Sequence, residues 1–247
     1  MHFLTDKYLI HNYLINQVRS LLVDFDDTLV DYKTCENLAL NDLFSWYQLD
    51  IEQYPGIGKL YTDINNKLWP LLEKGKMSIP EIRKRRFEIM SEKVPFNDDP
   101  LVIDSKYLKF FVKNTTISNS TISVIKSLKN AGYKIMITTN GIREVQRKRI
   151  NKVGLESIVD GVITSEDVEH AKPSPVMFET ALRRLSSKNE EAFVVGDSLT
   201  SDIAGANNAN IPSCWITEKF DSIDFRGLPK PDTVSPNFET FSNFILE

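Results

Sequence analysis

Five short apolar runs constrain the fold of this 247-residue chain more than any other feature. Each run has the length of a β-strand buried in a parallel sheet and is too short for a core helix. The runs are Leu21–Phe25, Lys134–Thr139, Gly161–Thr164, Ala192–Val195 and Cys214–Thr217. Segments with helical periodicity lie between or after them, namely Ile122–Leu128, Arg143–Val153, Val176–Leu185 and Ser201–Ala209. Strands that alternate with helices in this way predict an α/β fold, a doubly wound, Rossmann-like parallel sheet.

A long helical stretch interrupts this alternation after the first strand. Apolar residues recur there at helical spacing in three places, and Ser78 with Glu81 three residues later forms a capping box ahead of a further helix. The apolar groups are Leu40, Leu43, Phe44 and Tyr47, then the series from Ile57 to Leu72, then Tyr107, Leu108 and Phe111. We therefore expect an inserted all-helical cap over residues 31–114. The α/β core would comprise residues 1–30 and 115–247.

Composition narrows the classes of protein that this chain can belong to. The formal net charge of −4 and a pI near 5.6 argue against a partner that is a nucleic-acid polymer, which needs a basic footprint. Two cysteines, Cys35 and Cys214, do not make a disulfide framework and indicate reduced thiols. No apolar run is long enough to span a bilayer, and residues 1–19 read as a short amphipathic helix rather than a signal peptide. We expect a cytoplasmic enzyme with no membrane partner.

Acidic, hydroxyl, amide and lysine side chains follow the ends of the predicted strands. They are Asp24, Asp26, Thr28, Thr139, Asn140, Lys172, Asp197 and Asp202. In a doubly wound sheet these ends converge on one crevice. Carboxylates that are crowded together repel one another, and a hard divalent cation such as Mg²⁺ relieves that repulsion. The three histidines lack zinc-ligand spacing with the cysteines, so Mg²⁺ is the cofactor expected, with a phosphate group as its ligand.

The same residues form four motifs whose order and spacing can be compared with known families. The motifs are Asp24-x-Asp26-x-Thr28, Thr139-Asn140-Gly141, Lys172-Pro173 and Gly196-Asp197-Ser198-x3-Asp202. They resemble those of the haloacid dehalogenase-like hydrolase superfamily, and the helical insert resembles its first type of cap. Further segments resemble the noncanonical pyrimidine nucleotidase branch, which dephosphorylates nucleoside 5′-monophosphates. These are Asn66-Lys67-Leu68-Trp69, Arg86-Phe87-Glu88, Ala171-Lys172-Pro173 and Cys214-Trp215.

The resemblance implies a role for each motif position. Asp24 resembles the nucleophile that forms an aspartyl-phosphate. Asp26 resembles the general acid that protonates the leaving alkoxide and then the base that activates water. The implied metal ligands are Asp24, Asp197 and the backbone carbonyl of Asp26, with Asp202 and Thr28 supporting them. The implied phosphate clamp consists of Thr139, Asn140 and Lys172. Asp27 is left out, because strand alternation turns it to the other face.

Simpler interpretations of several features stay open. The basic runs Arg83–Arg86 and Arg143–Arg149 lie on predicted helices, and a solvated helix face explains them better than nucleic-acid contact. Aromatic residues of the cap at helical spacing are core residues more often than platforms for a base. They are Trp46, Tyr47, Tyr61, Trp69 and Phe87.

The function expected is Mg²⁺-dependent hydrolysis of a small phosphomonoester, with a pyrimidine nucleoside 5′-monophosphate as the favoured substrate. A sugar-phosphate phosphatase or a phosphomutase of the same superfamily is the main alternative. A 2-haloacid dehalogenase and a phosphate-receiver domain are weaker rivals. Alkyl halide displacement does not need the second acid at Asp26, and receivers are about half as long and have no helical insert.

Overall fold

A computed structural model describes residues 17–218 and 225–247 of the chain. The chain divides into two compact units. The first combines the segment that ends at Asp31 with Ile117–Glu247, and the second is Tyr32–Thr116.

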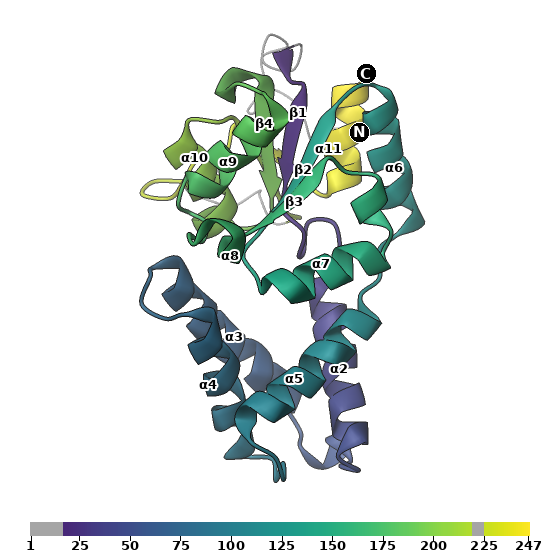
Figure 1. Ribbon diagram of the computed structural model, residues 1–247, viewed down its shortest axis with the longest axis vertical. Helices are drawn as coiled ribbons and strands as arrows, with labels where there is room; N and C mark the ends of the chain where they lie inside the picture. Colours follow the sequence, from purple (N-terminus) through teal and green to yellow (C-terminus); the bar gives the residue numbers. More distant parts are fainter. Residues whose placement is uncertain (1–16, 219–224) are drawn as a thin grey trace. The chain divides into compact units, whose positions relative to one another are not determined.

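The first unit is built on a six-stranded parallel sheet with the order β3-β2-β1-β4-β5-β6 (Figure 1). The strands are β1 (Ser20–Val23), β2 (Lys134–Thr139), β3 (Gly161–Thr164), β4 (Ala192–Gly196), β5 (Ser213–Ile216) and β6 (Thr233–Ser235). At the centre, Val23 of β1 pairs with Ile137 of β2 on one side and with Val195 of β4 on the other. The residues after β1 therefore lie between the carboxyl ends of β2 and β4. The doubly wound parallel sheet predicted from the sequence is confirmed.

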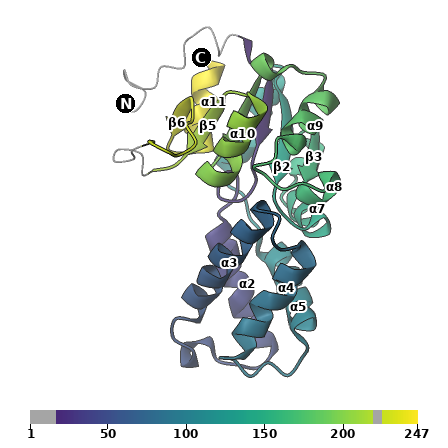
Figure 2. The same cartoon turned by 90° about the vertical axis from the view of Figure 1, so that its left-hand side faces the viewer.

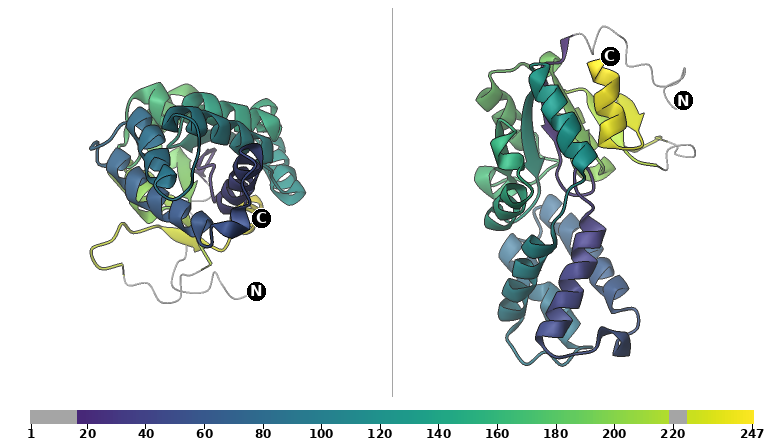
Figure 3. Two further views of the ribbon diagram at one scale, coloured as in Figure 1. Left: turned by 90° about the horizontal axis from the view of Figure 1, so that it is seen from below. Right: turned by 90° about the vertical axis from the view of Figure 1, so that its right-hand side faces the viewer.

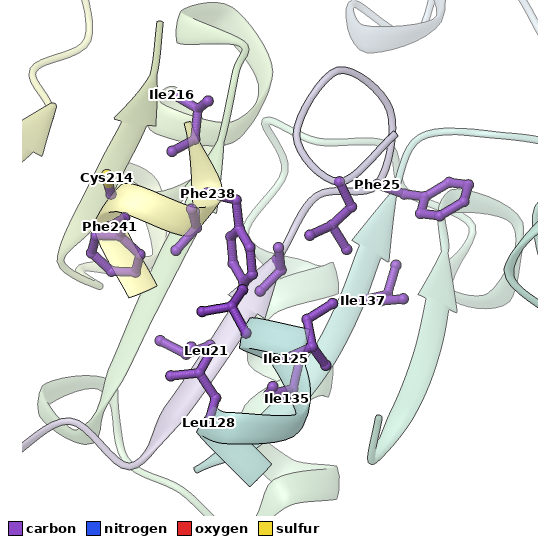
Figure 4. Packing of buried hydrophobic residues seen from close by; sticks show 14 of the residues in the cluster. Leu21, Phe25, Ile125, Leu128, Ile135, Ile137, Cys214, Ile216, Phe238 and Phe241 are labelled. Atoms are coloured by element: carbon purple, nitrogen blue, oxygen red, sulfur yellow. The ribbon is translucent and has the colours of Figure 1, made fainter. Parts of the chain in front are cut away.

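Helices cover both faces of this sheet, and the alternation of side chains along each strand explains how. On one face Leu21 and Val23 pack with α6 (Asn119–Asn130), α7 (Arg143–Lys152) and α11 (Phe238–Leu246), and α6 and α11 lie in front of the sheet in the right-hand view of Figure 3. Figure 4 shows the apolar side chains of this layer meeting over β1 and β2. On the other face Leu22 packs with α9 (Val176–Leu185) and α10 (Ala204–Ala209), which Figure 2 shows beside the sheet. Strands buried on both faces account for the continuous apolar runs in the sequence.

The second unit consists of helices within its described length. They are α2 (Tyr32–Trp46), α3 (Ile57–Glu73), α4 (Ile79–Ser91) and α5 (Pro100–Asn114). The predicted capping box is present at the start of α4, where the Glu81 carboxylate accepts a hydrogen bond of 2.7 Å from the backbone N–H of Ser78. The all-helical insert expected after the first strand is confirmed.

The interior of this unit corrects the expectation for Arg86, which we placed on a solvated helix face. Arg86 is only 3% exposed, and its Nε donates to Asp104 at 2.8 Å. The Arg86 guanidinium also lies 5.2 Å from the ring centroid of Tyr107. A basic residue can occupy a core position when an acid on the neighbouring helix neutralises it, and periodicity on one helix does not reveal that acid. Tyr61 and Phe87 are buried, in agreement with the core interpretation of the cap aromatics, but Trp46 is 59% exposed and corrects that interpretation. Tyr47 and Trp69 are partly buried.

Several elements differ from the sequence expectation. Strand β6 was not predicted because its three residues, Thr-Val-Ser, do not form an apolar run. Helix α11 was also missed, although Phe238, Phe241 and Ile245 have helical spacing. The helix expected from Ser201 begins earlier, as a π-helical turn over Leu199–Ile203. The amphipathic helix expected near the N-terminus lies almost entirely outside the described residues. In the described ranges, no helix combines the length and apolarity that a bilayer span requires.

Candidate active site

Asp24 stands at the centre of the site, directly after β1. Its backbone N–H donates to the carbonyl of Val195 at 2.9 Å, which continues the pairing of β1 with β4. Its side chain is almost fully buried. The Lys172 ammonium lies 2.6 Å from Oδ1 of Asp24 and 2.6 Å from Oδ1 of Asp202. It also donates to the carbonyl of Thr138 at 2.8 Å. These contacts fix one lysine between the ends of β1, β2 and β4.

Three carboxylates gather around this lysine. Oxygens of Asp24, Asp197 and Asp202 all lie within 4.8 Å of one another. Burial raises the pKa of Asp24 to about 8, against the lowering effect of Lys172. Burial, together with repulsion from Asp24 and Asp202, raises the pKa of Asp197 to about 9. Burial opposes the charged form of Lys172, but the two carboxylates that it contacts outweigh this and raise its pKa.

This donor set fits a divalent cation. Three carboxylates against one ammonium leave two negative charges, which a single divalent ion would balance. All of the candidate ligands are oxygen atoms, and hard cations such as Mg²⁺ prefer oxygen. Burial is the main cause of the raised pKa values of Asp24 and Asp197, and repulsion between the carboxylates adds to it. The part of the chain that the structure describes thus contains a cluster suited to the metal expected from the sequence.

Local backbone structure brings the fourth motif to this cluster. Gly196 leaves room for Asp202, because a Cβ atom at Gly196 would lie 2.3 Å from Cγ of Asp202. The backbone N–H of Ser198 donates to Oδ2 of Asp202 at 3.1 Å, so the two oxygens of that carboxylate have different partners. The indole N–H of Trp215 donates to the backbone carbonyl of Asp197 at 2.7 Å. A glycine, a backbone donor and an indole therefore orient these two acids.

The second and third motifs are joined through Asn140. Its amide oxygen accepts from the backbone N–H of Lys172 at 2.8 Å, and its amide nitrogen donates to the carbonyl of Lys172 at 2.9 Å. This closed pair of hydrogen bonds holds the backbone that carries Lys172. The hydroxyl oxygen of Thr139 accepts a hydrogen bond of 2.7 Å from Nε2 of Gln146. The O–H proton of Thr139 can still be donated to another acceptor.

Asp26 lies outside the group of three carboxylates that could share a cation. Its carboxylate instead pairs with Arg149 of α7, with Oδ1 at 2.7 Å from Nη2 and Oδ2 at 2.9 Å from Nη1. Gln146 also donates to Oδ2 of Asp26 at 2.8 Å. Arg149 is fully buried, which corrects its assignment to a solvated helix face. The sequence did not identify Gln146 and Arg149 as site residues. Their partner, Asp26, is 120 or more residues away in the sequence, so the helix pattern of α7 does not reveal the contact.

The other residues of the first motif also have defined positions. Asp27 has a positive φ of 58°, so strand alternation no longer applies to it. Asp27 is exposed, and its negative charge contributes to the rise in the pKa of Asp197. Thr28 is buried, and its hydroxyl has no hydrogen-bond partner among the described residues.

Comparison with known proteins identifies relatives that cover nearly the whole chain. Residues 21–216 match the family model described as haloacid dehalogenase-like hydrolase. The HAD-hydrolase YfnB of Bacillus subtilis is 30% identical over 203 residues, which cover 82% of this chain and 85% of YfnB. A crystal structure of YfnB bound to magnesium has a TM-score of 0.81 and 27% identity, covering 92% of this chain and 98% of that one.

Two further relatives have names that describe a phosphatase reaction. The pyrimidine 5′-nucleotidase PynA of Streptococcus pneumoniae is 29% identical, with 90% of each chain covered. A glyceraldehyde 3-phosphate phosphatase of Methanothermobacter thermautotrophicus is 28% identical over 85% of this chain and 93% of that protein.

Proposed function

This chain belongs to the haloacid dehalogenase-like hydrolase family, and we propose that it is a Mg²⁺-dependent phosphatase acting on pyrimidine nucleoside 5′-monophosphates. The observation that carries the proposal is the buried contact of Lys172 with Asp24 and Asp202 inside a group of three carboxylates. A nucleophilic carboxylate beside a buried lysine ammonium, within a group of carboxylates that can bind a metal ion, is suited to phosphoryl transfer. In that reaction the negative charge of the phosphoryl group must be neutralised.

In the proposed mechanism an Asp24 oxygen attacks the phosphorus atom and forms an aspartyl-phosphate, while the bond from phosphorus to the ester oxygen breaks. Asp26 donates a proton to the departing alkoxide, which leaves as a neutral alcohol. Asp26 then removes a proton from water, and that water attacks the phosphorus atom of the aspartyl-phosphate while the bond from phosphorus to the Asp24 oxygen breaks. Inorganic phosphate is released, and Asp24 and Asp26 return to their starting states.

Other residues of the chain bind the phosphoryl group and supply metal ligands. The Lys172 ammonium and the Thr139 hydroxyl would neutralise and orient the phosphoryl oxygens, with Asn140 completing the clamp. Mg²⁺, held by the Asp24 and Asp197 carboxylates and the backbone carbonyl of Asp26, would supply Lewis-acid stabilisation of charge on the phosphoryl oxygens. We assign the supporting positions around these ligands to Asp202 and Thr28.

The proposed substrate class rests on the sequence resemblance and on PynA, whose similarity extends over 90% of both chains. We propose that the helical unit, Tyr32–Thr116, is the cap that selects the leaving group and that the unit carrying the sheet performs the chemistry. The partner is then a small phosphomonoester, and the proposed location is the cytoplasm. A sugar-phosphate phosphatase is the second candidate, supported by the glyceraldehyde 3-phosphate phosphatase among the relatives.

A phosphate-release screen with Mg²⁺ present tests the proposal. We expect pyrimidine nucleoside 5′-monophosphates to be hydrolysed with higher kcat/KM than purine nucleotides, sugar phosphates or triose phosphates. A preference for sugar or triose phosphates would replace the nucleotidase proposal with the second candidate. Transfer of the phosphoryl group without release of inorganic phosphate would indicate a phosphomutase. Asp24→Asn should abolish turnover and leave the far-ultraviolet circular dichroism spectrum unchanged.

A further inference from the structure

Arg149 is the largest fully buried side chain in the described part of the protein, and its guanidinium faces Asp26. Nη1 donates a hydrogen bond of 2.9 Å to Oδ2 of Asp26, and Nη2 makes an ion-pair contact of 2.7 Å with Oδ1. The Cζ atom lies 5.0 Å from the ring centroid of Phe25. A guanidinium that contacts both carboxylate oxygens restricts the plane of the carboxylate as well as its position. Burying an arginine costs free energy, so its complete burial beside a functional acid calls for a physical explanation.

Gln146 extends this contact to the second motif. Its Nε2 atom donates to Oδ2 of Asp26 at 2.8 Å and to the hydroxyl of Thr139 at 2.7 Å. Its Oε1 atom accepts from Nη1 of Arg149 at 2.7 Å. One amide therefore links the arginine, the acid at the end of β1 and the hydroxyl at the end of β2. Because Gln146 and Arg149 are three residues apart on α7, both project from one face of that helix.

The second motif also has a glycine that makes room for this arrangement. A Cβ atom at Gly141 would lie 2.8 Å from Cγ of Gln146 and 3.0 Å from its Nε2. The end of the Gln146 side chain cannot move away freely, because it is hydrogen-bonded to three partners. Gly141 is thus required for the same contact, independently of Arg149.

We propose that Gln146 and Arg149 are positioning residues that orient the Asp26 carboxylate for proton transfer to the leaving group. The inference rests on the proposed phosphatase function, in which Asp26 is the proton donor. Neither residue touches the three-carboxylate cluster in the contacts described above, so their effect reaches the reaction through Asp26 and, for Gln146, through Thr139. The pair binds Asp26 from the side of α7 and sets the direction in which its carboxylate can reach a leaving oxygen.

The test compares two esters that differ in their need for a proton. The alkoxide of a nucleoside 5′-monophosphate must be protonated as it leaves, whereas p-nitrophenolate is a stable leaving group. Rapid-quench measurement of leaving-group release in the first turnover isolates this step from hydrolysis of the aspartyl-phosphate. For Arg149→Met we expect this rate to fall by about tenfold or more with the nucleotide, and by less than about threefold with p-nitrophenyl phosphate.

Two further variants separate positioning from a general loss of structure. Gly141→Ala leaves every charge in place and should reproduce the selective loss with the nucleotide by displacing Gln146. Arg147→Met is the matched control on α7, because Arg147 is 47% exposed at its side chain and pairs with Asp167, and its rates should be unchanged. An equal loss with both esters in Arg149→Met, or no loss, would overturn the positioning role.

The Asp26→Asn background distinguishes this inference from the function on which it rests. If Arg149 acts through Asp26, adding Arg149→Met to Asp26→Asn should lower first-turnover release from the nucleotide by no more than about twofold further. A further tenfold loss would overturn the inference alone. If Asp26→Asn itself showed no leaving-group dependence, the role of Asp26 as proton donor would fail, and the positioning role with it.

Discussion

Replacing Lys172 with methionine is expected to lower the free energy of unfolding by about 3–5 kcal/mol, because it leaves buried carboxylates without their cation. The Nζ atom lies 2.6 Å from an oxygen of Asp24 and 2.6 Å from an oxygen of Asp202. With an effective dielectric constant of about 20, each contact contributes about 6 kcal/mol of gross attraction. The cost of burying the ammonium offsets much of this, which is why the expected net loss is smaller.

The loss should grow as the pH rises. The pKa of Asp24 is raised to about 8 and that of Asp197 to about 9, so in the folded protein both groups bind protons more tightly than in the unfolded chain. Stability from such groups is present below their unfolded pKa and is lost as the pH rises through the folded values. Lys172 lowers the pKa of Asp24, so without it the ionised form of Asp24 loses its stabilising charge, and the cost of that loss appears only at pH values where Asp24 ionises in the wild type. The gap between wild type and variant should therefore be wider at pH 9 than at pH 6.

Urea-induced unfolding, followed by circular dichroism in the presence of a chelator, measures this loss. Lys148→Met is a matched control, because Lys148 is 61% exposed at its side chain and forms a surface pair with Glu144. The control should change the free energy of unfolding by less than about 0.5 kcal/mol. A loss below about 1 kcal/mol in Lys172→Met at pH 9 would refute the electrostatic reasoning.

Three other perturbations test the cluster and the cap. Mg²⁺ at about 100 times its dissociation constant should stabilise the wild type by about 2.7 kcal/mol, and Asp197→Asn should remove most of that gain in a thermal melt; an unchanged gain would exclude Asp197 as a ligand. Gly196→Ala should cost about 1–3 kcal/mol and reduce Mg²⁺-dependent phosphate release, because its methyl group displaces Asp202; full stability and activity would contradict the close contact. Asp104→Asn should cost about 3–5 kcal/mol in urea unfolding, since Arg86 stays buried without its counter-charge; a loss under about 1 kcal/mol would argue that Arg86 is solvated.

The fold was predictable from the sequence where the hydrophobic pattern of a segment matches its burial in the folded protein. Lys134–Thr139 and Gly161–Thr164 form strands with the predicted bounds, because strands buried on both faces carry consecutive apolar residues that the sequence displays directly. Strand β6 could not be found in this way, because its pairing with β5 and the packing around Val234 bury it, while its own three residues carry little signal.

The sequence predicted which residues belong to the candidate site better than it predicted which of them contact one another. The sequence placed Asp24, Lys172, Asp197 and Asp202 at strand ends, and parallel strands bring such ends together whatever the loops do. It did not show which side chains pair. That Lys172 contacts Asp202 as well as Asp24 depends on a glycine at position 196 and on the turn that carries Asp202.

Charged residues on helices were the hardest to interpret from sequence. Arg147 and Arg149 belong to one basic run, yet the first is about half-exposed and the second is fully buried. The difference arises from Asp26, which comes from a distant part of the chain and neutralises only Arg149. A helix pattern records which residues share a face but not which partner meets that face, so buried ion pairs between distant segments need the structure.

Chemical trapping of the covalent intermediate tests the central claim most directly. Borohydride reduces an acyl phosphate on aspartate to homoserine, so quenching the enzyme with borohydride during turnover and mapping the product by mass spectrometry locates the nucleophile. We predict homoserine at position 24 when Mg²⁺ and a nucleoside 5′-monophosphate are both present, and none when the nucleotide is omitted. Rapid turnover with no reduced residue at position 24, or with homoserine at another aspartate, would contradict the assignment of Asp24 as the nucleophile.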